Sequence, residues 1–189
     1  MNHLVVGGYY LTMTNCENKL SVRIANESDL SEIMVIIDAA KDFIHSQGIN
    51  QWVNGYPSSD VILDDIKNGC SYVLTDEETG AIMATSFISF NGESTYDKIY
   101  EGAWGEENAE FCVIHRVAVN SSCRRSGMAN AMFEYAAGLC RERGYKYLRA
   151  DTHRDNLKMQ GALKKAGFVY RGIIYLENGD ERFAFEKTI

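Results

Sequence analysis

RVAVNSSCRRSGMA, residues 116–129, is the stretch that decides the fold of this chain. Its first part belongs to the run Glu110–Val119, which is rich in Val and Ile and predicts a strand. After Gly127, apolar residues recur every three or four positions, which predicts a helix with one buried face. That face consists of Met128, Ala131, Met132, Tyr135, Ala136 and Leu139. A strand, a polar turn and a long helix therefore follow one another.

Patterns on both sides of this unit extend it into a mixed order of strands and helices. Before it, helices are predicted from Leu30 to about Gln47 and from Ser59 to Ile66, and strands at Val22–Ile24, Ser71–Thr75 and Ala81–Phe90. After it, a helix is predicted at Asn156–Ala166, and strands at Tyr147–Asp151, Phe168–Leu176 and Glu181–Phe185. The pair Asn178-Gly179 between the last two strands is a strong hairpin signal. We therefore expect a mixed α/β domain.

Length and composition indicate one globular domain. The chain has 189 residues, of which 46% are hydrophobic and 24% charged, and these fractions are close to the globular average. Residues 1–20 lack a clear periodicity and are expected to form a loosely ordered extension, whereas residues 21–189 form the domain. Five cysteines without a CxxC pair predict neither a disulfide framework nor a zinc site. We expect a cytoplasmic protein without a metal.

The charge and the apolar runs exclude two classes of partner. The formal net charge is −7, whereas a general nucleic-acid surface needs clustered Lys and Arg. No apolar run is long enough for a membrane span, and the segment Leu4–Leu11 lacks the preceding basic region of a signal peptide. We therefore expect no nucleic acid and no membrane as partner. An acidic surface suits cationic amine substrates.

The turn between the strand and the long helix has the composition of a phosphate-binding site. The first N–H groups of a helix are unpaired and carry the positive end of its dipole. Gly127 and Ala129 keep side chains away from a ligand, while Arg124 and Arg125 add positive charge. No Gly-Lys-[Ser/Thr] follows and no GxGxxG is present, so neither a Walker loop nor a dinucleotide fold is indicated. The alternative is an ordinary helix-start turn closed by Gly127.

The chain resembles the GNAT superfamily of acetyl-CoA-dependent N-acetyltransferases over about residues 21–186. Three blocks in the correct order carry this resemblance: Val22-Arg23-Ile24-Ala25 with Asp29, Arg116-Val117-Ala118-Val119 with the turn up to Ala129, and Asp151-Thr152-His153-Arg154-Asp155-Asn156 leading to Ala166-Gly167-Phe168. The resemblance implies a GNAT-like fold with a central, mostly antiparallel sheet of about seven strands and about four helices. Its fourth and fifth strands would splay apart, so that the pantetheine arm of acetyl-CoA lies between them.

The resemblance also implies which residues bind acetyl-CoA. Main-chain groups around Val117 and Val119 would bind pantetheine, the turn would cradle the pyrophosphate, and Asn156 would lie beside the arm. The expected cofactor-binding set is Val117, Ala118, Val119, Arg124, Arg125, Ser126, Gly127, Met128, Ala129, Asn130 and Asn156.

The expected chemistry is direct attack of a neutral amine on the thioester in a ternary complex. The protein must then remove an ammonium proton and stabilise the developing thiolate. Many relatives use as acid a tyrosine seven positions after the helix-starting asparagine, and this chain has Leu163 there. The candidates for the proton chemistry, each with a structural role as the alternative, are Asp151, His115, His153 and Tyr170.

Two irregular segments, 48–58 and 91–108, correspond to the acceptor pocket of relatives. Their aromatic residues can bind an amine by cation–π contact or pack onto the core: Trp52, Tyr56, Tyr96 and Tyr100. We expect an N-acetyltransferase, an enzyme of the acyltransferase class, that acts on a primary amine of a small molecule or a peptide N-terminus. Because Leu163 replaces the tyrosine, the alternative is a non-catalytic acyl-CoA-binding sensor or interaction module. Exposed edge strands near the carboxy terminus are compatible with a homodimer.

Overall fold

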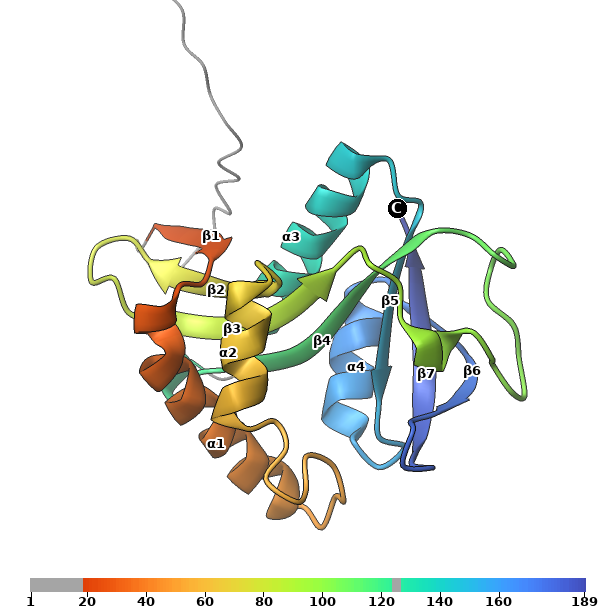
Figure 1. Cartoon of the computed structure of the whole chain (residues 1–189), viewed down its shortest axis with the longest axis horizontal. Helices are drawn as coiled ribbons and strands as arrows, with labels where there is room; N and C mark the ends of the chain where they lie inside the picture. Colours follow the sequence, from red (N-terminus) through yellow and green to blue (C-terminus); the bar gives the residue numbers. More distant parts are fainter. Residues whose placement is uncertain (1–18, 124–126) are drawn as a thin grey trace, which may run out of the picture.

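The computed structural model describes residues 19–123 and 127–189, which form a twisted sheet with helices on both faces (Figure 1). Across the sheet the strand order is β1-β2-β3-β4-β5-β7-β6. The strands are β1 (Leu20–Ile24), β2 (Ser71–Asp76), β3 (Ile82–Ser89), β4 (Phe111–Val119), β5 (Tyr147–Thr152), β6 (Val169–Tyr175) and β7 (Glu181–Thr188). In the same described residues the α-helices are α1 (Leu30–His45), α2 (Ser59–Lys67), α3 (Met128–Arg143) and α4 (Leu157–Lys165). The mixed α/β fold with seven strands and four helices is confirmed.

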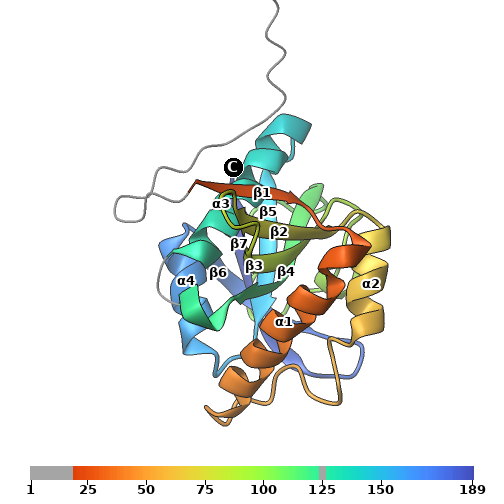
Figure 2. The ribbon, with the colours of Figure 1, turned by 90° about the vertical axis from the view of Figure 1, so that its left-hand side faces the viewer.

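Each face of the sheet is covered by one pair of helices (Figure 2). Ile37 of α1 and Ile62 of α2 pack with Val73 of β2 on one face. Phe133 of α3 and Leu163 of α4 belong to the larger core on the other face. Burying one side chain of this size stabilises the fold by roughly 1.5–3 kcal/mol, so the two pairs are fixed firmly on the sheet. The α1 and α2 pair therefore covers one face of the sheet, and the α3 and α4 pair covers the other.

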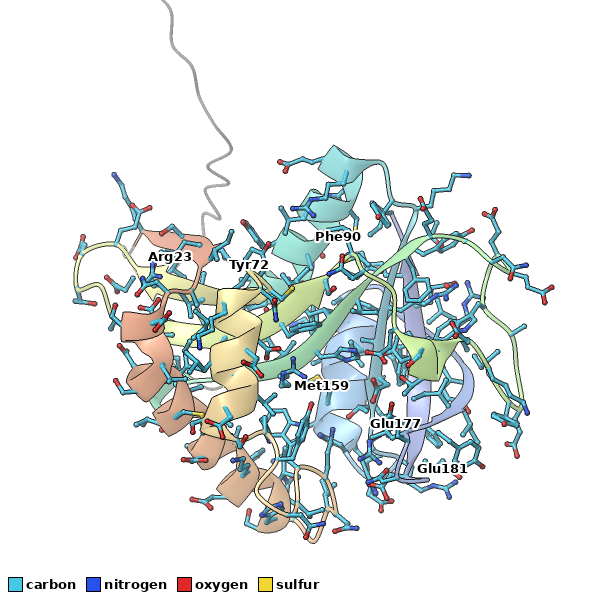
Figure 3. The ribbon with its side chains drawn as sticks, viewed as in Figure 1. Arg23, Tyr72, Phe90, Met159, Glu177 and Glu181 are labelled. Carbon is cyan, nitrogen blue, oxygen red and sulfur yellow. The ribbon has the colours of Figure 1, made fainter. Side chains whose placement is uncertain are left out.

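The start of α1 is tied to β1 by a network of side chains. The Asp29 carboxylate accepts hydrogen bonds from both terminal nitrogens of the Arg23 guanidinium, at 2.7 and 2.8 Å. It also accepts one from the Asn26 backbone N–H at 2.8 Å. The hydrogen bond from Arg23 and the backbone hydrogen bond lower the pKa of Asp29 against the effect of burial. Arg23 therefore lies beside the first turn of this helix (Figure 3) and joins the edge strand to it.

The sheet opens between β4 and β5. These two strands run parallel and pair only from Phe111 opposite Tyr147 to Val113 opposite Arg149. The other neighbouring strands are antiparallel and pair over longer stretches. Beyond Val113 the two strands diverge, and Figure 1 shows β4 turning away from β5. The predicted splay between the fourth and fifth strands is confirmed.

A β-bulge in β4 lies at the start of this opening. The register between β3 and β4 moves by one residue, because Thr85 is opposite Ala118 whereas Phe87 is opposite His115. One extra residue is thus inserted in β4, and Arg116 has the left-handed backbone angle φ 52°. A bulge of this kind bends its strand and re-aims its side chains. It accounts for the change in direction of β4.

The segment between β3 and β4 is anchored on the far half of the sheet by a buried ion pair. The Glu186 carboxylate of β7 accepts hydrogen bonds from Arg149 Nε at 2.9 Å and from the Gly105 N–H at 2.9 Å. The Arg149 guanidinium lies 4.1 Å from the centre of the Trp104 ring. Burial lowers the pKa of Arg149, while the hydrogen bond to Glu186 opposes that shift. The long segment therefore has a fixed course rather than a free one.

Gly102 gives a direct test of this anchoring. A Cβ added at Gly102 would lie 1.8 Å from the backbone oxygen of Arg171, a distance that real Cβ atoms do not adopt. We expect Gly102→Ala to lower the free energy of unfolding by about 1–3 kcal/mol, because the segment must move. The matched control is Gly161→Ala in α4, where a Cβ meets nothing within 4 Å. There, alanine should stabilise the helix by about 0.5–1 kcal/mol. Urea unfolding measures the stability of both variants. If Gly102→Ala were as stable as Gly161→Ala, the anchoring would be contradicted.

Candidate active site

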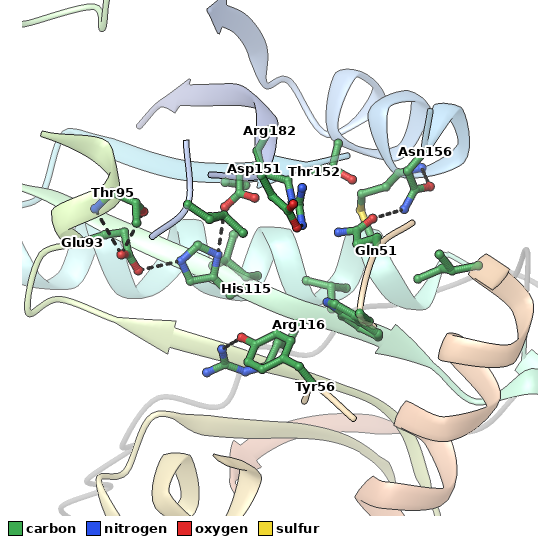
Figure 4. A pocket seen from close by; sticks show the side chains of 18 of the residues that line it. Gln51, Tyr56, Glu93, Thr95, His115, Arg116, Asp151, Thr152, Asn156 and Arg182 are labelled. Atoms are coloured by element: carbon green, nitrogen blue, oxygen red, sulfur yellow. Dashed lines mark hydrogen bonds and ion pairs between the residues drawn. The ribbon is translucent and has the colours of Figure 1, made fainter. Parts of the chain in front are cut away.

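The opening between β4 and β5 holds a pocket of about 540 Å³. Its walls come from the segment between α1 and α2, from β4, β5 and α4, and from the turn between β6 and β7. Figure 4 shows the polar side chains that point into it. The volume lies within the range of roughly 300–1,000 Å³ that is typical of small-molecule sites. The splay, the bulge and the pocket thus coincide, and this is the candidate active site.

Arg116 holds one wall of the pocket in place from the bulge. Its guanidinium donates to Asp65 Oδ2 of α2 at 2.7 Å and to the Tyr56 hydroxyl at 2.8 Å. The same guanidinium lies 4.4 Å from the centre of the Phe87 ring. Burial raises the pKa of Asp65, and the Arg116 charge opposes this shift. The segment between α1 and α2 is thereby fixed to β4.

A chain of hydrogen-bonding side chains crosses the opposite wall, and Figure 4 shows its part from Asp151 through His115 to Glu93. The Tyr96 hydroxyl donates a hydrogen bond to Asp151 Oδ1 at 2.7 Å. The same carboxylate oxygen is 3.4 Å from His115 Nδ1. His115 Nε2 is in turn 3.2 Å from Glu93 Oε2. The structure therefore brings together Asp151 and His115, two of the four predicted candidates for proton chemistry, and adds a second carboxylate beyond them.

The two ends of this chain have shifted proton affinities. The hydrogen bond from His115 lowers the pKa of Glu93 from 4.5 to about 2, against the effect of burial. Burial raises the pKa of Tyr96 well above 10, and the nearby Asp151 charge raises it further. Tyr96 thus stays protonated as a donor, while Glu93 stays ionised over the working pH range. Perturbed groups of this kind that face a pocket are typical of functional sites.

Asn156 links the start of α4 to the segment between α1 and α2. Its side-chain oxygen accepts a hydrogen bond from the Met159 N–H at 3.1 Å and so caps the helix. Its amide nitrogen donates to Gln51 Oε1 at 3.0 Å. Both polar atoms of this side chain thus have a role in fixing the pocket wall. Asn156 lines the pocket, as expected of a residue beside a bound ligand.

The side of the pocket next to α3 and α4 is largely apolar. Ile114, Phe133 and Leu163 line it, and Leu163 is 1% exposed. Thr152 is a polar exception, because its side chain is buried and its hydroxyl has no hydrogen-bond partner in the part of the chain that is described. The residue at the tyrosine position of relatives therefore offers the pocket a hydrocarbon surface and no proton.

The predicted phosphate turn is described from Gly127 onward. Arg124, Arg125 and Ser126 lie outside the described residues. Gly127 has φ 87° and precedes α3 without any side-chain cap hydrogen bond. Among the described residues, the N-cap position of α3 therefore offers no side chain to the first N–H groups of the helix, as an anion site at a helix start requires. Met128 is buried in the core, and Ala129 packs against it.

The predicted cofactor residues of β4 differ in where they lie. Val117 lines the pocket beside the bulge. Ala118 is buried under the α1 and α2 pair, and Val119 packs against the core on the other face. Asn130, in the first turn of α3, is partly exposed. The alternation of this strand thus places one of its three predicted residues in the pocket lining.

The predicted aromatic acceptor residues divide into two groups. Trp52 and Tyr56 line the pocket. Tyr96 is 1% exposed and packs in a buried cluster, so only its hydroxyl is directed at the polar chain. Tyr100 pairs its backbone with Ile173 outside the pocket lining.

The two remaining catalytic candidates lie outside the pocket lining. Tyr170 of β6 is 40% exposed and packs edge-on against Phe183 and Phe185. His153 follows β5, where its Nδ1 accepts a hydrogen bond from the Asp155 N–H at 3.1 Å. The pocket therefore groups Asp151 with His115 and leaves Tyr170 and His153 elsewhere.

Sequence reasoning missed several polar residues of the pocket. They are Gln51, Glu93, Arg116 as a side chain, Thr152 and Arg182. Arg182 is 6% exposed and donates to the Glu181 carbonyl at 2.9 Å and to Asp180 Oδ2 at 3.3 Å. The length of segment 91–108 signalled a functional role, yet nothing in its sequence distinguishes Glu93 from its other acidic residues. The places of these missed residues in the pocket become apparent only from the fold.

The described residues, 19–123 and 127–189, contain neither a metal-binding cluster nor a membrane-spanning helix. Within them, no group of three or more His, Cys, Asp or Glu side chains could hold a metal ion. Among the helices of those residues, none combines the length and apolar character that a membrane crossing needs.

Sequence comparison identifies the family of this chain. The Acetyltransferase (GNAT) family matches residues 41–168, which is more than half of the chain. The chain therefore belongs to the GNAT family of acetyltransferases. A comparison with curated proteins gave no match.

Solved structures of acetyltransferases share the fold. A GNAT-family acetyltransferase from Streptococcus agalactiae 2603 is 30% identical with a TM-score of 0.83, and the match covers 97% of this chain and 99% of that one. The PaiA N-acetyltransferase from Thermoplasma acidophilum, solved with coenzyme A, is 14% identical with a TM-score of 0.64, covering 90% and 99%. The NatC complex bound to Gag peptide and CoA is 15% identical with a TM-score of 0.62, covering 90% and 98%.

The shifted pKa of Glu93 predicts a pH dependence of stability. Glu93 has a folded-state pKa of about 2 against an ordinary 4.5, so its ionised form stabilises the fold above pH 4.5. That contribution is lost as the pH falls towards 2, because protonation then favours the unfolded chain. We expect the free energy of unfolding of wild type to exceed that of Glu93→Gln by about 1–3 kcal/mol at pH 5.5. The difference should shrink towards pH 3. Urea unfolding at several pH values measures this difference in stability. A difference that stays constant with pH would contradict the lowered pKa of Glu93.

Proposed function

We propose that this protein is an acetyl-CoA-dependent N-acetyltransferase that transfers an acetyl group to a primary amine. The observation that carries the proposal is the contact between Asp151 and His115 at the opening between β4 and β5. Membership of the GNAT family supports acetyl transfer, and the pocket supplies a base for an amine acceptor. The acceptor is a small-molecule amine or a peptide N-terminus. The reaction proceeds by direct attack in a ternary complex.

Acetyl-CoA would enter along the face covered by α3 and α4. The start of α3 at Gly127, with Met128 to Asn130, would receive the pyrophosphate, together with Arg124 to Ser126. The pantetheine arm would extend between β4 and β5, where Val117 and Asn156 line the pocket. The apolar surface around Leu163 suits the hydrocarbon part of the arm. Two structural relatives were solved with coenzyme A, which supports this assignment.

The acceptor amine would enter from the opposite face. Glu93, Asp151, Glu177 and Asp180 line that part of the pocket, and Asp180 is paired with Arg182. An excess of carboxylates attracts a cationic amine. Trp52 and Tyr56 line the pocket as well, and aromatic faces stabilise ammonium groups by cation–π contact. The N-acetyltransferase and peptide-bound relatives are consistent with an amine acceptor.

Asp151 and His115 would remove the proton that keeps the acceptor unreactive. An alkyl ammonium group has a pKa of about 10.4 and carries no free electron pair for attack. A carboxylate and an imidazole within reach of the acceptor supply general base catalysis. After attack, the C–N bond forms, the C–S bond breaks and the electron pair leaves with the sulfur of coenzyme A. Because Asp151 and His115 meet at the pocket, catalysis is favoured over a role as a non-catalytic sensor.

The phosphate site is tested by Gly127→Glu. The added carboxylate would stand at the start of α3 and repel the pyrophosphate, so we expect acetyl-CoA to bind at least about 10-fold more weakly. Gly80→Glu is the matched control, because Gly80 also has a left-handed backbone, φ 74°, and lies in a distant turn with open space around it. Isothermal titration calorimetry measures both dissociation constants. Unchanged affinity in Gly127→Glu would refute the site.

The base is tested by Asp151→Asn. We expect kcat to fall by about 100-fold with acetyl-CoA affinity unchanged, because the amide accepts a hydrogen bond but takes no proton. Asp155→Asn is the control, since Asp155 is exposed outside the pocket lining. Release of coenzyme A is measured with spermidine, lysine and a tetrapeptide with a free α-amino group. Binding of acetyl-CoA without turnover on any amine would favour the sensor instead.

A further inference from the structure

His115 is enclosed by groups that come from three separate parts of the chain: β3, the segment between β3 and β4, and β5. Its Nε2 is 3.2 Å from Glu93 Oε2, and its Nδ1 is 3.4 Å from Asp151 Oδ1. The Phe87 ring stacks on it at 5.9 Å between ring centres, and the Tyr96 ring meets it at 5.8 Å. The ring is therefore held so that each nitrogen is directed at a carboxylate.

The remaining charged groups near this ring neutralise one another. Arg116 follows His115 in β4, and Asp65 of α2 lies close enough for the His115 charge to lower its pKa. Arg116 and Asp65 form an ion pair at 2.7 Å. Glu93 and Asp151 thus remain as the two carboxylates that act on the imidazole directly.

Glu93 is itself fixed at the outer end of this arrangement. Its Oε1 accepts hydrogen bonds from the Thr95 hydroxyl at 3.0 Å and from the Thr95 N–H at 3.5 Å, which leaves Oε2 for His115. The side chain of Glu93 is 27% exposed, whereas that of Asp151 is 12% exposed. Glu93 therefore faces solvent on one side and the imidazole on the other, while Asp151 faces the interior of the pocket.

The contacts of the two ring nitrogens favour Nε2 as the position of the proton in neutral His115. A neutral imidazole has one N–H and one acceptor nitrogen. Asp151 Oδ1 already accepts the Tyr96 hydroxyl at 2.7 Å, and the contact from Nδ1 to this oxygen is the longer one at 3.4 Å. The contact between Nε2 and Glu93 has the geometry of a hydrogen bond. The lone pair of Nδ1 is then directed at Asp151.

We propose that Glu93 is a positioning residue for amine acetylation. Its carboxylate holds the N–H of His115 on Nε2 and stabilises the imidazolium that forms when Asp151 passes the acceptor's proton to Nδ1. This inference rests on the proposed function, because it supposes an ammonium acceptor. Glu93 acts through His115 and does not touch the acceptor, in the way that a carboxylate orients the histidine of a catalytic triad.

The proton balance of the reaction agrees with this arrangement. An ammonium acceptor R–NH₃⁺ and acetyl-CoA give the amide, the thiol of coenzyme A and one H⁺. Of the two N–H bonds that break, one proton passes through Asp151 to His115 and then to water. The other ends on the sulfur after the C–S bond has broken. One base is therefore needed per turnover, and His115 is returned to its neutral state by solvent.

The charge state of Glu93 supports a role in orientation rather than in proton uptake. The hydrogen bond from His115 lowers the pKa of Glu93 to about 2. Glu93 is therefore ionised at any pH at which the enzyme works. A carboxylate that stays charged accepts the Nε2–H of His115 and does not take up the proton itself.

The variant Glu93→Gln tests whether Glu93 acts on His115 through its negative charge or only as a structural hydrogen-bond acceptor. Glutamine keeps a hydrogen-bond acceptor for Nε2–H but has no charge. With the tetrapeptide as acceptor at pH 7, we expect kcat to fall at least about 10-fold with the KM for acetyl-CoA unchanged. At pH 9 the α-amino group, with a pKa of about 8, is already neutral, so the loss should shrink to within about 3-fold. The control Glu107→Gln makes the same charge change at an exposed position of the same segment and should match wild type at both pH values.

An equal loss of activity at pH 7 and pH 9 would overturn the proposal, because a structural defect does not depend on the acceptor's protonation. If wild type acetylates no amine, the proposed function fails, and a second measurement still tests the His115 tautomer on which the inference depends. In ¹⁵N-edited NMR spectra of the wild-type histidine side chains, neutral His115 should carry its proton on Nε2, with its signals assigned by their loss in His115→Gln. A proton on Nδ1 would overturn the assignment.

Discussion

The separation of β4 from β5 is the constraint on which the rest of this structure depends. Pairing between the two strands ends at Val113 and Arg149, and the bulge at Arg116 then carries β4 away. Backbone groups at such an opening must be satisfied by water or by a ligand, because an unpaired buried group costs about 1–3 kcal/mol. An extended ligand that can pair like a strand is the natural occupant. The bulge persists because Asp65 and Tyr56 hold the Arg116 side chain.

The same opening explains why the long segment between β3 and β4 is built as it is. His115 of β4 and Asp151 of β5 lie beyond the last paired residues of the two strands, and their side chains meet across the opening at 3.4 Å. Tyr96 and Glu93 fill the space on one side, and they are placed there by a segment anchored to Glu186 through Gly105. The buried ion pair under that segment therefore serves the site indirectly. The Arg149 charge also opposes the rise in the pKa of Tyr96, and the ion pair fixes the segment that carries Tyr96 and Glu93.

The sequence was sufficient to predict the fold and the splay but only part of the site. Periodicity located the helices and strands because each buries one face, and the resemblance placed the opening next to Val117. The pairing of Asp151 with His115 was within reach, since both were candidates on neighbouring strands. Glu93 was not, because its role depends on the course of an irregular segment that no periodicity describes. Its contact with His115 spans 22 residues of chain, and that segment is anchored to Glu186 through Gly105.

Leu163 removes a tyrosine that many relatives carry, and the energetics of the two proton transfers indicate why this is tolerable. A thiol has a pKa of about 8.5, so the thiolate of coenzyme A is a fair leaving group near neutral pH even without a side-chain acid. An alkyl ammonium group with a pKa of about 10.4 is neutral in only about one molecule in 2,500 at pH 7. Deprotonation of the acceptor is therefore the more demanding step. In the proposed reaction, a site with an apolar surface at Leu163 and with an imidazole held by two carboxylates would place its proton chemistry where the barrier is larger.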